Sequence, residues 1–412
     1  MSRRVVITGM GTVNPLGKNV EEYWENIKAN KLGVSYIDQF DTSDFPVKIV
    51  GAVKDFDPSE YIDKKEAKRL DRFTQFATVA AKQALAQAGT DFSDIVPFRA
   101  GVIIGVGIGG LNMTEAEVTK FNEKPDKVSV FFIPMMIGNM AAGTVAMQTG
   151  FKGDNFCTTT ACASATHAIG EAFRKIKDGY LDVALCGGSE ACISRFALSG
   201  FNNMKALSRA EKLEEASTPF DLNRQGFVLG EGAGVLCLEE YEHAKARGAN
   251  IIAEIAGYGA TGDAYHMTSP SPTGEAAAYA MKCAYEEAGL KPEEVNYINA
   301  HGTSTGLNDK YETTAIKLAL GEEAARKTVI NSTKSMIGHL LGAAGGVEAI
   351  VTALSVKEGF IHRTLGYKTP DPECDLDYAT DANRHVDIKG ALSNSLGFGG
   401  HNATICIKKY EG

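Results

Sequence analysis

The 412-residue sequence lacks long apolar runs, paired cysteine motifs and an excess of basic residues. No stretch approaches the roughly 18 uninterrupted apolar residues that a membrane-spanning helix needs, so we expect no membrane insertion. With 51 acidic against 42 basic residues, the formal net charge of −9 argues against a nucleic-acid partner. The first apolar run is interrupted at Thr8, Gly9 and Gly11, too soon for a signal-peptide core. We therefore expect no export signal and a cytoplasmic protein.

The eight cysteines form no CxxC pair and show no Cys/His spacing typical of a structural zinc site. A disulfide framework is not expected either, because the chain is long and shows no export signal. We expect no metal site, and we expect most of these cysteines to be reduced thiols that pack as small hydrophobic residues.

Glycine is in excess, at 44 of 412 residues, and much of it follows short apolar runs. These runs are rich in β-branched residues, alternate with helical stretches, and lead into glycine-rich turns. They lie at residues 99–110, 181–191, 232–248, 249–260 and 295–306. A further strand is expected at residues 5–8. This alternation predicts an α/β fold with sheets that are buried on both faces.

Two helical segments of unusually small residues, beginning near residues 160 and 335, resemble each other. Helices rich in alanine and glycine suit a crowded interior, where they approach neighbouring backbone closely. The sequence therefore predicts a duplicated α/β unit with one buried helix in each half. We expect the halves at residues 1–255 and 256–412.

Cys162 lies at the start of the first small-residue helix, in TTACASATHAIGEA. A thiol in the first turn of a helix is close to the positive end of the helix dipole and to free backbone N–H groups. Both lower its pKa, so Cys162 is a candidate nucleophile. The alternative is that Cys162 is one more buried thiol.

Two histidines and one glycine-rich turn accompany this cysteine. His301 follows the strand-like VNYINA, and His339 lies five residues after Lys334 at the start of the second small-residue helix. Phe398 lies within the glycine-rich GFGG turn. Taken singly, each histidine is more typical of a structural role. The glycine-rich turn by itself is more typical of a simple tight bend.

Six sequence blocks together carry a resemblance to a known family. They are TACASATHAIGEA, STPFDLNRQGFVLGEGAG, AYHMTSP, NAHGTSTGLNDKYE, STKSMIGHLLGAAGG and NSLGFGGHN. In this order they closely resemble the β-ketoacyl-[acyl-carrier-protein] synthases, in particular the elongating enzymes of type II fatty-acid synthesis. The resemblance implies a thiolase fold of five αβαβα layers, a homodimer, and acyl-carrier protein as partner. It implies no required cofactor and leaves open a structural monovalent cation.

The resemblance also implies catalytic roles. Cys162 would accept an acyl chain as a thioester, and His301 and His339 would stabilise the enolate that forms when a malonyl thioester loses CO₂. The backbone N–H groups of Cys162 and Phe398 would hold the second oxyanion, with Phe398 acting as a gate. Lys334 would order the site electrostatically with Glu348 as its partner, although a purely structural ion pair is the alternative.

Substrate contacts and a docking surface follow from the same resemblance. Thr303 and Thr305 match residues that bind the phosphopantetheine arm, and Ile108 and Phe201 match residues that line the acyl tunnel. For apolar residues, core packing is the simpler alternative. A docking face for the acidic carrier protein is expected on a helix at residues 64–72, with a solvated charged surface as the alternative. Its basic residues are Lys65, Lys68, Arg69 and Arg72, with help from Lys205.

Other assignments remain open at this point. A thiolase would use a second cysteine near the C-terminus, and an initiating synthase would pair cysteine with histidine and asparagine; neither matches the blocks above. A ketosynthase of a polyketide or aryl-polyene pathway would use the same three residues. A non-catalytic, length-determining partner of a heterodimeric synthase would lack the nucleophile.

Overall fold

The computed structural model describes residues 3–412, and its centre is one ten-stranded sheet in the order β10-β9-β13-β14-β8-β1-β7-β6-β4-β5. Five strands come from the first half of the sequence: β1 (Val5–Val13), β4 (Ala100–Gly105), β5 (Asn155–Thr158), β6 (Val183–Glu190) and β7 (Gly232–Glu240). Five come from the second half: β8 (Ala253–Gly262), β9 (Val295–Asn299), β10 (Val329–Asn331), β13 (Gly390–Gly397) and β14 (His401–Lys408). Each half of the sequence therefore builds one side of the sheet.

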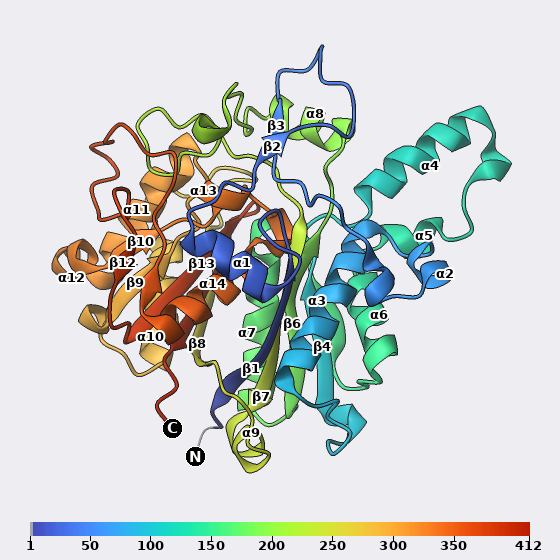
Figure 1. The fold of residues 1–412 in the computed structure, drawn as a ribbon. Coiled ribbons are helices and arrows are strands. Elements are labelled where there is room, and N and C mark those ends of the chain that lie inside the picture. Colours follow the sequence, from blue (N-terminus) through green and yellow to red (C-terminus); the bar gives the residue numbers. More distant parts are fainter. Residues whose placement is uncertain (1–2) are drawn as a thin grey trace.

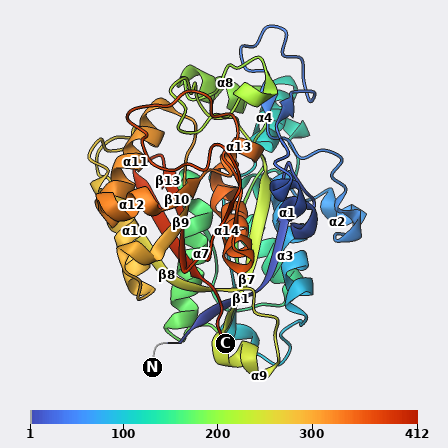
Figure 2. The ribbon, with the colours of Figure 1, turned by 60° about the vertical axis from the view of Figure 1, so that its left-hand side comes forward.

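The two halves of the sheet meet at a short seam. Strands β1 and β8 pair through only three residue pairs, from Val5↔Ile255 to Ile7↔Ala253. The remaining strands diverge and enclose α7 (Ser164–Lys177) and α14 (Ala344–Glu358), which contact strands of both halves. Figures 1 and 2 show these two helices in the middle of the molecule.

Helices cover the outer face of each half of the sheet. On the first half these are α3 (Arg72–Ala88) and α6 (Met140–Thr149); on the second they are α10 (Glu275–Glu287) and α11 (Gly306–Leu320). Buried side chains form one cluster around α7 and α14 and one beneath each outer helix layer. The predicted α/β fold of five αβαβα layers is therefore confirmed.

The small residues of the central helices are explained by close packing. A Cβ on Gly105 of β4 would lie 2.3 Å from the backbone of Ser164 in α7. A Cβ on Gly234 of β7 would lie 2.4 Å from the backbone of Gly346 in α14. All residues of α14 from Ala344 to Val356 are buried. Larger side chains at these contacts would push the helices off the sheet.

The remaining elements surround this core. The helices are α1 (Val20–Lys28), α2 (Lys64–Ala67), α4 (Leu111–Glu123), α5 (Phe132–Met136), α8 (Arg195–Asn203), α9 (Tyr241–Ala246), α12 (Glu322–Lys327) and α13 (Lys334–Ile337). Two small ladders pair β2 (Ser35–Tyr36) with β3 (Ile49–Val50) and β11 (Phe360–Ile361) with β12 (Arg384–His385). Within residues 3–412, no helix is long and apolar enough to cross a membrane.

Two boundaries expected from the sequence, the end of the first strand and the division into halves, can be compared with the observed strands. The first strand runs from Val5 to Val13 and is longer than the expected 5–8, because Gly9 and Gly11 sit against the backbone of α3 and continue the strand instead of ending it. The boundary expected after residue 255 falls inside β8 and stays a prediction.

Candidate active site

Cys162 lies in a single 3-10 turn, Ala161–Ala163, directly before α7 and not in the first turn of the α-helix as expected. Ala161 has a φ of +50°, an uncommon value for a residue with a side chain. The hydroxyl of Ser164 donates to the carbonyl of Ala161 at 2.7 Å and accepts from the N–H of Thr160 at 2.8 Å, which holds the turn. The strained turn presents Cys162 toward the C-terminal half.

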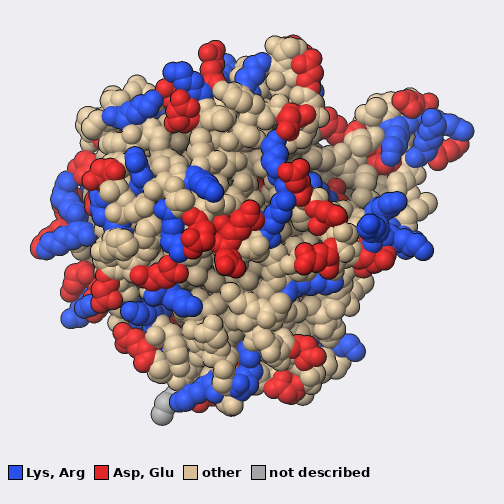
Figure 3. Space-filling model, in the orientation of Figure 1, with Lys and Arg blue, Asp and Glu red and all other residues tan. Residues whose placement is uncertain are grey.

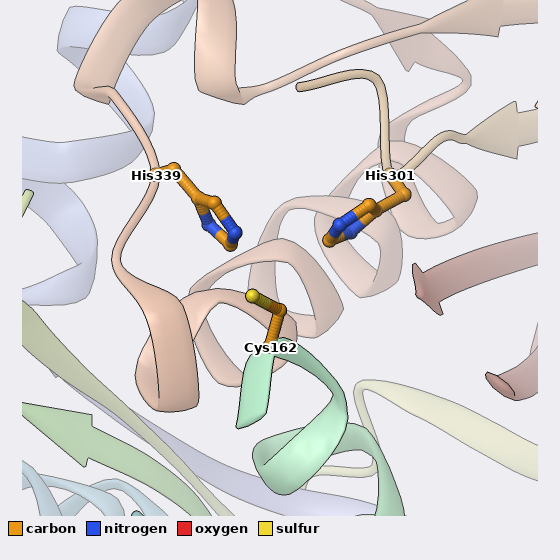
Figure 4. Close-up of side chains that lie close together, drawn as sticks. All are labelled: Cys162, His301 and His339. Atoms are coloured by element: carbon orange, nitrogen blue, oxygen red, sulfur yellow. The ribbon is translucent and has the colours of Figure 1, made fainter. Parts of the chain in front are cut away.

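His301 and His339 reach the thiol from two other segments. His301 follows β9, and His339 lies between α13 and α14, directly after Gly338 with its φ of +75°. The sulfur of Cys162 and a nitrogen of each imidazole lie within 4.8 Å of one another. Figure 4 shows the three side chains pointing toward a common centre. The structure thus brings together three residues that are 139 and 38 positions apart in sequence.

The backbone determines the tautomer of His339. The N–H of Leu341 donates to Nδ1 of His339 at 3.3 Å, so the proton of the neutral ring is on Nε2. The backbone of His339 is fixed as well, because its N–H donates to Val228 and its carbonyl accepts from Gly230. His339 is therefore a positioned hydrogen-bond donor at Nε2.

His301 is positioned by Glu312, which sequence reasoning missed. The two carboxylate oxygens of Glu312 accept from the N–H groups of His301 and Gly302, at 2.7 and 2.8 Å. Asn394 of β13 also donates to this carboxylate, at 3.3 Å. Burial raises the pKa of Glu312 to about 7. The only signal in the sequence was that Glu312 belongs to the NAHGTSTGLNDKYE block.

Both active-site imidazoles are neutral near physiological pH. Burial lowers the pKa of His301 and of His339 well below the ordinary histidine value, and the charge of Lys334 lowers both further. In His301, Nδ1 is buried without a hydrogen-bond partner among the described residues. An unpaired buried ring nitrogen is energetically unfavourable.

Cys162 itself departs from the expectation of a lowered pKa. The side chain is only 8 % exposed, and burial raises the pKa of the thiol to about 12. The charge of Lys334 is the largest opposing influence, and a hydrogen bond from the Phe398 backbone also lowers the value. The prediction was wrong for the resting protein, because loss of water around the thiolate outweighs the positive groups nearby.

Lys334 and Glu348 form a buried ion pair. The Nζ of Lys334 donates to Oε1 of Glu348 at 2.5 Å, and both side chains are 1 % exposed. The lysine charge lowers the pKa of both imidazoles and of the thiol. A buried charge with this effect fits an electrostatic influence on the site.

Phe398 occupies the turn between β13 and β14. The turn contains Gly399 and Gly400 with φ of +88° and +75°, and Gly399 donates to the carbonyl of Met267 at 2.7 Å. Phe398 is half-buried and lines the same cavity as Cys162. It therefore stands at the boundary between thiol and solvent.

A cavity of about 490 Å³ joins these groups. Of the described residues, its lining includes Cys162, His301, His339 and Phe398 but not Lys334. It also includes four other residues named from the sequence. These are Phe201, Thr303, Thr305 and Lys205. The hydroxyls of Thr303 and Thr305 are 2.8 Å apart. Ile108 is not among the described lining residues; its side chain is 41 % exposed, because the chain turns outward after β4.

The expected basic helix at residues 64–72 is broken. Helix α2 ends at Ala67, and Asp71 caps the separate helix α3, which starts at Arg72. The guanidinium of Arg72 forms an ion pair with Glu231 at 2.8 Å while its side chain is 37 % exposed, so its docking role stays a prediction. The other docking candidates of the segment, Lys65, Lys68 and Arg69, are exposed. Figure 3 shows basic side chains at the right of the molecule, where Figure 1 places α2.

The same three site residues could be considered as metal ligands. Cysteine and two histidines are a plausible set for zinc. The N–H of Leu341 occupies Nδ1 of His339, so Nε2 is the ring atom of this residue that a metal could bind. A bound metal would displace the thiol proton, so the raised pKa of Cys162 does not decide between the two uses. The expected absence of a metal site stays a prediction.

Comparison with known proteins yields consistent matches over the whole chain. Residues 2–244 match the model "Beta-ketoacyl synthase, N-terminal domain", and residues 252–368 match "Beta-ketoacyl synthase, C-terminal domain". The chain is 50 % identical to "3-oxoacyl-[acyl-carrier-protein] synthase 2" of Staphylococcus aureus, over 100 % of this chain and 99 % of that protein. It is 48 % identical to the protein of the same name from Synechocystis sp., over 99 % of each chain.

Solved structures agree with the sequence matches. A ketosynthase described as part of a type II PKS complex with its acyl-carrier protein has a TM-score of 0.92 at 38 % identity, with 100 % of both chains covered. A β-ketoacyl synthase from Burkholderia phymatum has a TM-score of 0.91 at 34 % identity, covering 99 % of this chain and 100 % of that one.

Proposed function

The chain belongs to the β-ketoacyl synthase family, and we propose that Cys162, His301 and His339 carry out its condensation reaction. Its activity is that of an elongating β-ketoacyl-[acyl-carrier-protein] synthase of type II fatty-acid synthesis, an acyltransferase, as in the curated relatives of about 50 % identity. The observation that supports the residue assignment is the meeting of one thiol and two neutral imidazoles within 4.8 Å in a single cavity.

The first step is transfer of an acyl group to Cys162. The sulfur attacks the carbonyl of an acyl thioester, a new C–S bond forms, and the carrier thiol leaves with the proton of Cys162. Thioester exchange is nearly isoenergetic, so the acyl group stays reactive toward carbon. Because the resting thiol is protonated, its proton must leave as the sulfur attacks.

The second step is decarboxylation of a malonyl thioester. The bond to the carboxylate breaks, CO₂ leaves, and the electron pair moves into the adjacent thioester as an enolate. Nε2–H of His339 and the ring N–H of His301 donate to the enolate oxygen. Each well-placed donor in a site without water contributes on the order of 3 kcal/mol to the transition state.

The third step forms the carbon–carbon bond. The enolate carbon attacks the acyl carbonyl on Cys162, the C–S bond breaks, and the cysteine sulfur recovers a proton. During this step the N–H groups of Cys162 and Phe398 hold the acyl oxygen, a role supported by the position of both residues in the lining of one cavity. Burial and the positive charge of Lys334 keep the imidazoles neutral, because both lower the imidazole pKa. The proposal needs no cofactor, and a structural monovalent cation stays a prediction.

The substrates would arrive on the phosphopantetheine arm of acyl-carrier protein. Thr303 and Thr305 present neighbouring hydroxyls in the cavity for the arm, and Phe201 contributes an apolar wall for the acyl chain. Exposed Lys65 and Lys68, together with Lys205 at the cavity, supply a basic docking surface for an acidic partner. Arg69 lies over the ring of Phe131 and belongs to the same surface.

We propose that two copies of the chain form a homodimer. Exposed apolar side chains gather on α4 to α6 and the neighbouring loops, beside the edge strand β5. They are Ile108, Val118, Phe121, Val130, Ile133 and Met147. Apolar surface of this kind and an open sheet edge are typical of interfaces. A second copy here would also cover Ile108. In the dimer this residue would then lie beside the acyl chain, as expected from the sequence.

The dimer can be tested by light scattering after gel filtration. The double change Val130→Glu and Ile133→Glu should shift the mass from two copies to one. The matched control is Tyr279→Glu, an equally exposed apolar position on α10, and it should leave the mass unchanged. A wild-type monomer would overturn the proposal.

All eight cysteines are free, which supports a reducing compartment and the proposed cytoplasmic location.

The function is tested by incubating the purified chain alone with acyl- and malonyl-loaded acyl-carrier protein and identifying products. One condensation per primer, giving a β-ketoacyl product, is expected. A poly-β-keto chain would instead indicate a polyketide ketosynthase, a class represented among the structural neighbours.

A further inference from the structure

The segment Ser217–Gly234 is a family block to which the reaction above assigns no chemical role. Its first ten residues run beneath the loop His301–Gly306, which carries the two cavity threonines. Contacts between the two segments are made through backbone groups and buried side chains. They join a part of the first sequence half to the substrate side of the second.

The loop needs such support because its central residue is strained. Ser304 has a φ of +68°, in the left-handed region that residues with side chains seldom adopt. Its hydroxyl accepts from the N–H of Thr218 at 2.9 Å, and its carbonyl accepts from the N–H of Gly226 at 2.9 Å. The strain places the hydroxyls of Thr303 and Thr305, on either side of Ser304, 2.8 Å apart in the cavity.

Arg224 holds the end of the same loop. Its side chain is 5 % exposed, and its guanidinium donates to the carbonyls of Thr305 and Gly306, at 3.0 and 2.7 Å. It also donates to the carbonyl of Asp221 at 2.8 Å and to the carboxylate of Asp371 at 2.6 Å. Two of these bonds hold the end of the loop, and the other two anchor the rigid guanidinium to Asp221 and Asp371.

We propose that Arg224, with Asp371 as its counter-charge, is a positioning residue that holds Thr303 and Thr305 for the pantetheine arm of the substrate carrier. Arg224 stands outside the set of described residues that line the cavity, so it acts through the loop rather than on the substrate. The inference rests on the proposed function and deepens it, because it names what keeps the arm site in shape.

A lysine cannot replace this arginine. Lysine keeps the charge beside Asp371, but its single ammonium group lacks the planar fork that reaches two carbonyls, a third carbonyl and a carboxylate at once. Arg224→Lys should therefore release the end of the loop at Thr305 and Gly306. Glu312 still holds the N–H groups of His301 and Gly302, so the catalytic side chains should stay in place. Asp371→Asn is a milder change, since it removes the counter-charge and keeps the side-chain shape.

The experiment compares substrates that carry the arm with one that lacks most of it. KM and kcat are measured for malonyl-loaded acyl-carrier protein and for the malonyl thioester of N-acetylcysteamine, whose short thiol ends before the middle of the arm. For Arg224→Lys, KM for the carrier-bound substrate should rise about tenfold, with kcat within about twofold of wild type. Kinetics with the short thioester should not change. Asp371→Asn should raise the carrier KM about threefold.

The control is Arg247→Lys. Arg247 is another largely buried arginine, bound to Glu239 and to the carbonyl of Ala88, but it lies in the first half away from the cavity. It should lower thermal stability without changing either KM. Labelling of Cys162 by iodoacetamide checks that each variant retains its site.

The outcomes separate this inference from the proposed function. An unchanged carrier KM in a folded Arg224→Lys protein overturns the positioning role, as does an equal loss with both substrates. If Arg224→Lys does not fold, Asp371→Asn decides in the same way. A wild-type protein that condenses neither substrate would instead overturn the proposed function.

Discussion

The two buried helices α7 and α14 begin in the same way, but only one of them carries the nucleophile. A 3-10 turn precedes each helix, Ala161–Ala163 before α7 and Leu341–Ala343 before α14. The first residue of each turn has a positive φ, +50° at Ala161 and +47° at Leu341. The middle residue is Cys162 in the first turn and Gly342 in the second. The backbone geometry is duplicated, and the reactive group is not.

The glycine in the second turn has a structural reason. A Cβ on Gly342 would lie 2.1 Å from the backbone nitrogen of Gly107, and the N–H of Gly342 donates to Glu190. The same carboxylate accepts from the N–H groups of Gly107 and Gly109 at the end of β4. The second turn thus ties the halves together, while the first turn presents the thiol.

The outer layers repeat more faithfully than the site. A Cβ on Gly9 or Gly11 of β1 would lie 2.0 or 1.9 Å from a carbonyl of α3. At Gly257 and Gly259 of β8 the corresponding distances to carbonyls of α10 are also 2.0 and 1.9 Å. Where only packing matters the halves have kept the same contacts. They differ where one half holds the nucleophile and the other holds the hydrogen-bond donors.

The largest expected effect comes from removing the group that distinguishes the two turns. Cys162→Ala should lower the rate of condensation by more than about 10⁴-fold, because no other thiol reaches the acyl group. The rate is measured as β-ketoacyl product from carrier-bound substrates, and iodoacetamide labelling at this peptide should disappear. Full condensation by this variant would show that Cys162 is not the nucleophile, and the two turns would then not differ in this way.

The next effect tests the donors that the second half contributes. His301→Ala and His339→Ala should each lower the condensation rate about 10²- to 10³-fold, because each removes one hydrogen bond to the enolate. Acyl transfer to Cys162, followed by mass spectrometry, should survive. His362→Asn, a buried histidine of the same half, is the control and should lower stability without changing kcat. Equal losses in all three variants would mean that the histidines are structural.

A third change tests why the second turn carries glycine. Gly342→Ala should lower the free energy of unfolding by about 3 kcal/mol or more, because the added Cβ meets backbone that cannot move aside. Gly200→Ala in α8, where a Cβ meets nothing within 4 Å, should be neutral or slightly stabilising. Denaturant unfolding measures both. A neutral Gly342→Ala would show that the two turns could both carry side chains.

The smallest effect concerns the protonation of the thiol at the first turn. Alkylation requires the thiolate, so a thiol pKa raised to about 12 makes the rate at Cys162 rise about tenfold per pH unit, without a plateau, through pH 9. N-acetylcysteine, with an ordinary thiol pKa, should level off earlier. A plateau below pH 8 at Cys162 would mean that the N–H groups at the start of α7 outweigh burial.

The α/β fold and its buried small-residue helices could be predicted from composition, whereas the five layers followed from the family resemblance. Cys162, His301 and His339 each lie in a block of that family, and the structure brings them together; their catalytic roles stay a prediction. The prediction of a single helix at 64–72 was wrong, because Asp71 caps a new helix that starts at Arg72. Arg72 forms an ion pair with Glu231, a residue of a distant segment.

Other features depend on distance in space and could not be read locally. Glu190 acts by binding backbone N–H groups of a loop that is remote in sequence, and nothing in its own neighbourhood marks that role. Glu312 lies in the same block as His301, but the block alone does not show that its carboxylate binds the backbone there. The pKa of Cys162 depends on how much water reaches the sulfur, which is decided by the packing of both halves. Ile108 is exposed in the single chain, so its predicted role depends on a second copy.

The central claim is that one half supplies the nucleophile and the other supplies the enolate donors. Release of CO₂ from malonyl-loaded acyl-carrier protein tests it most directly, in Cys162→Ala with and without His339→Ala. The account predicts that Cys162→Ala still releases CO₂ while forming no condensed product, and that adding His339→Ala lowers the release about 10²-fold or more. Loss of CO₂ release with Cys162→Ala alone, or unchanged release in the double variant, would contradict it.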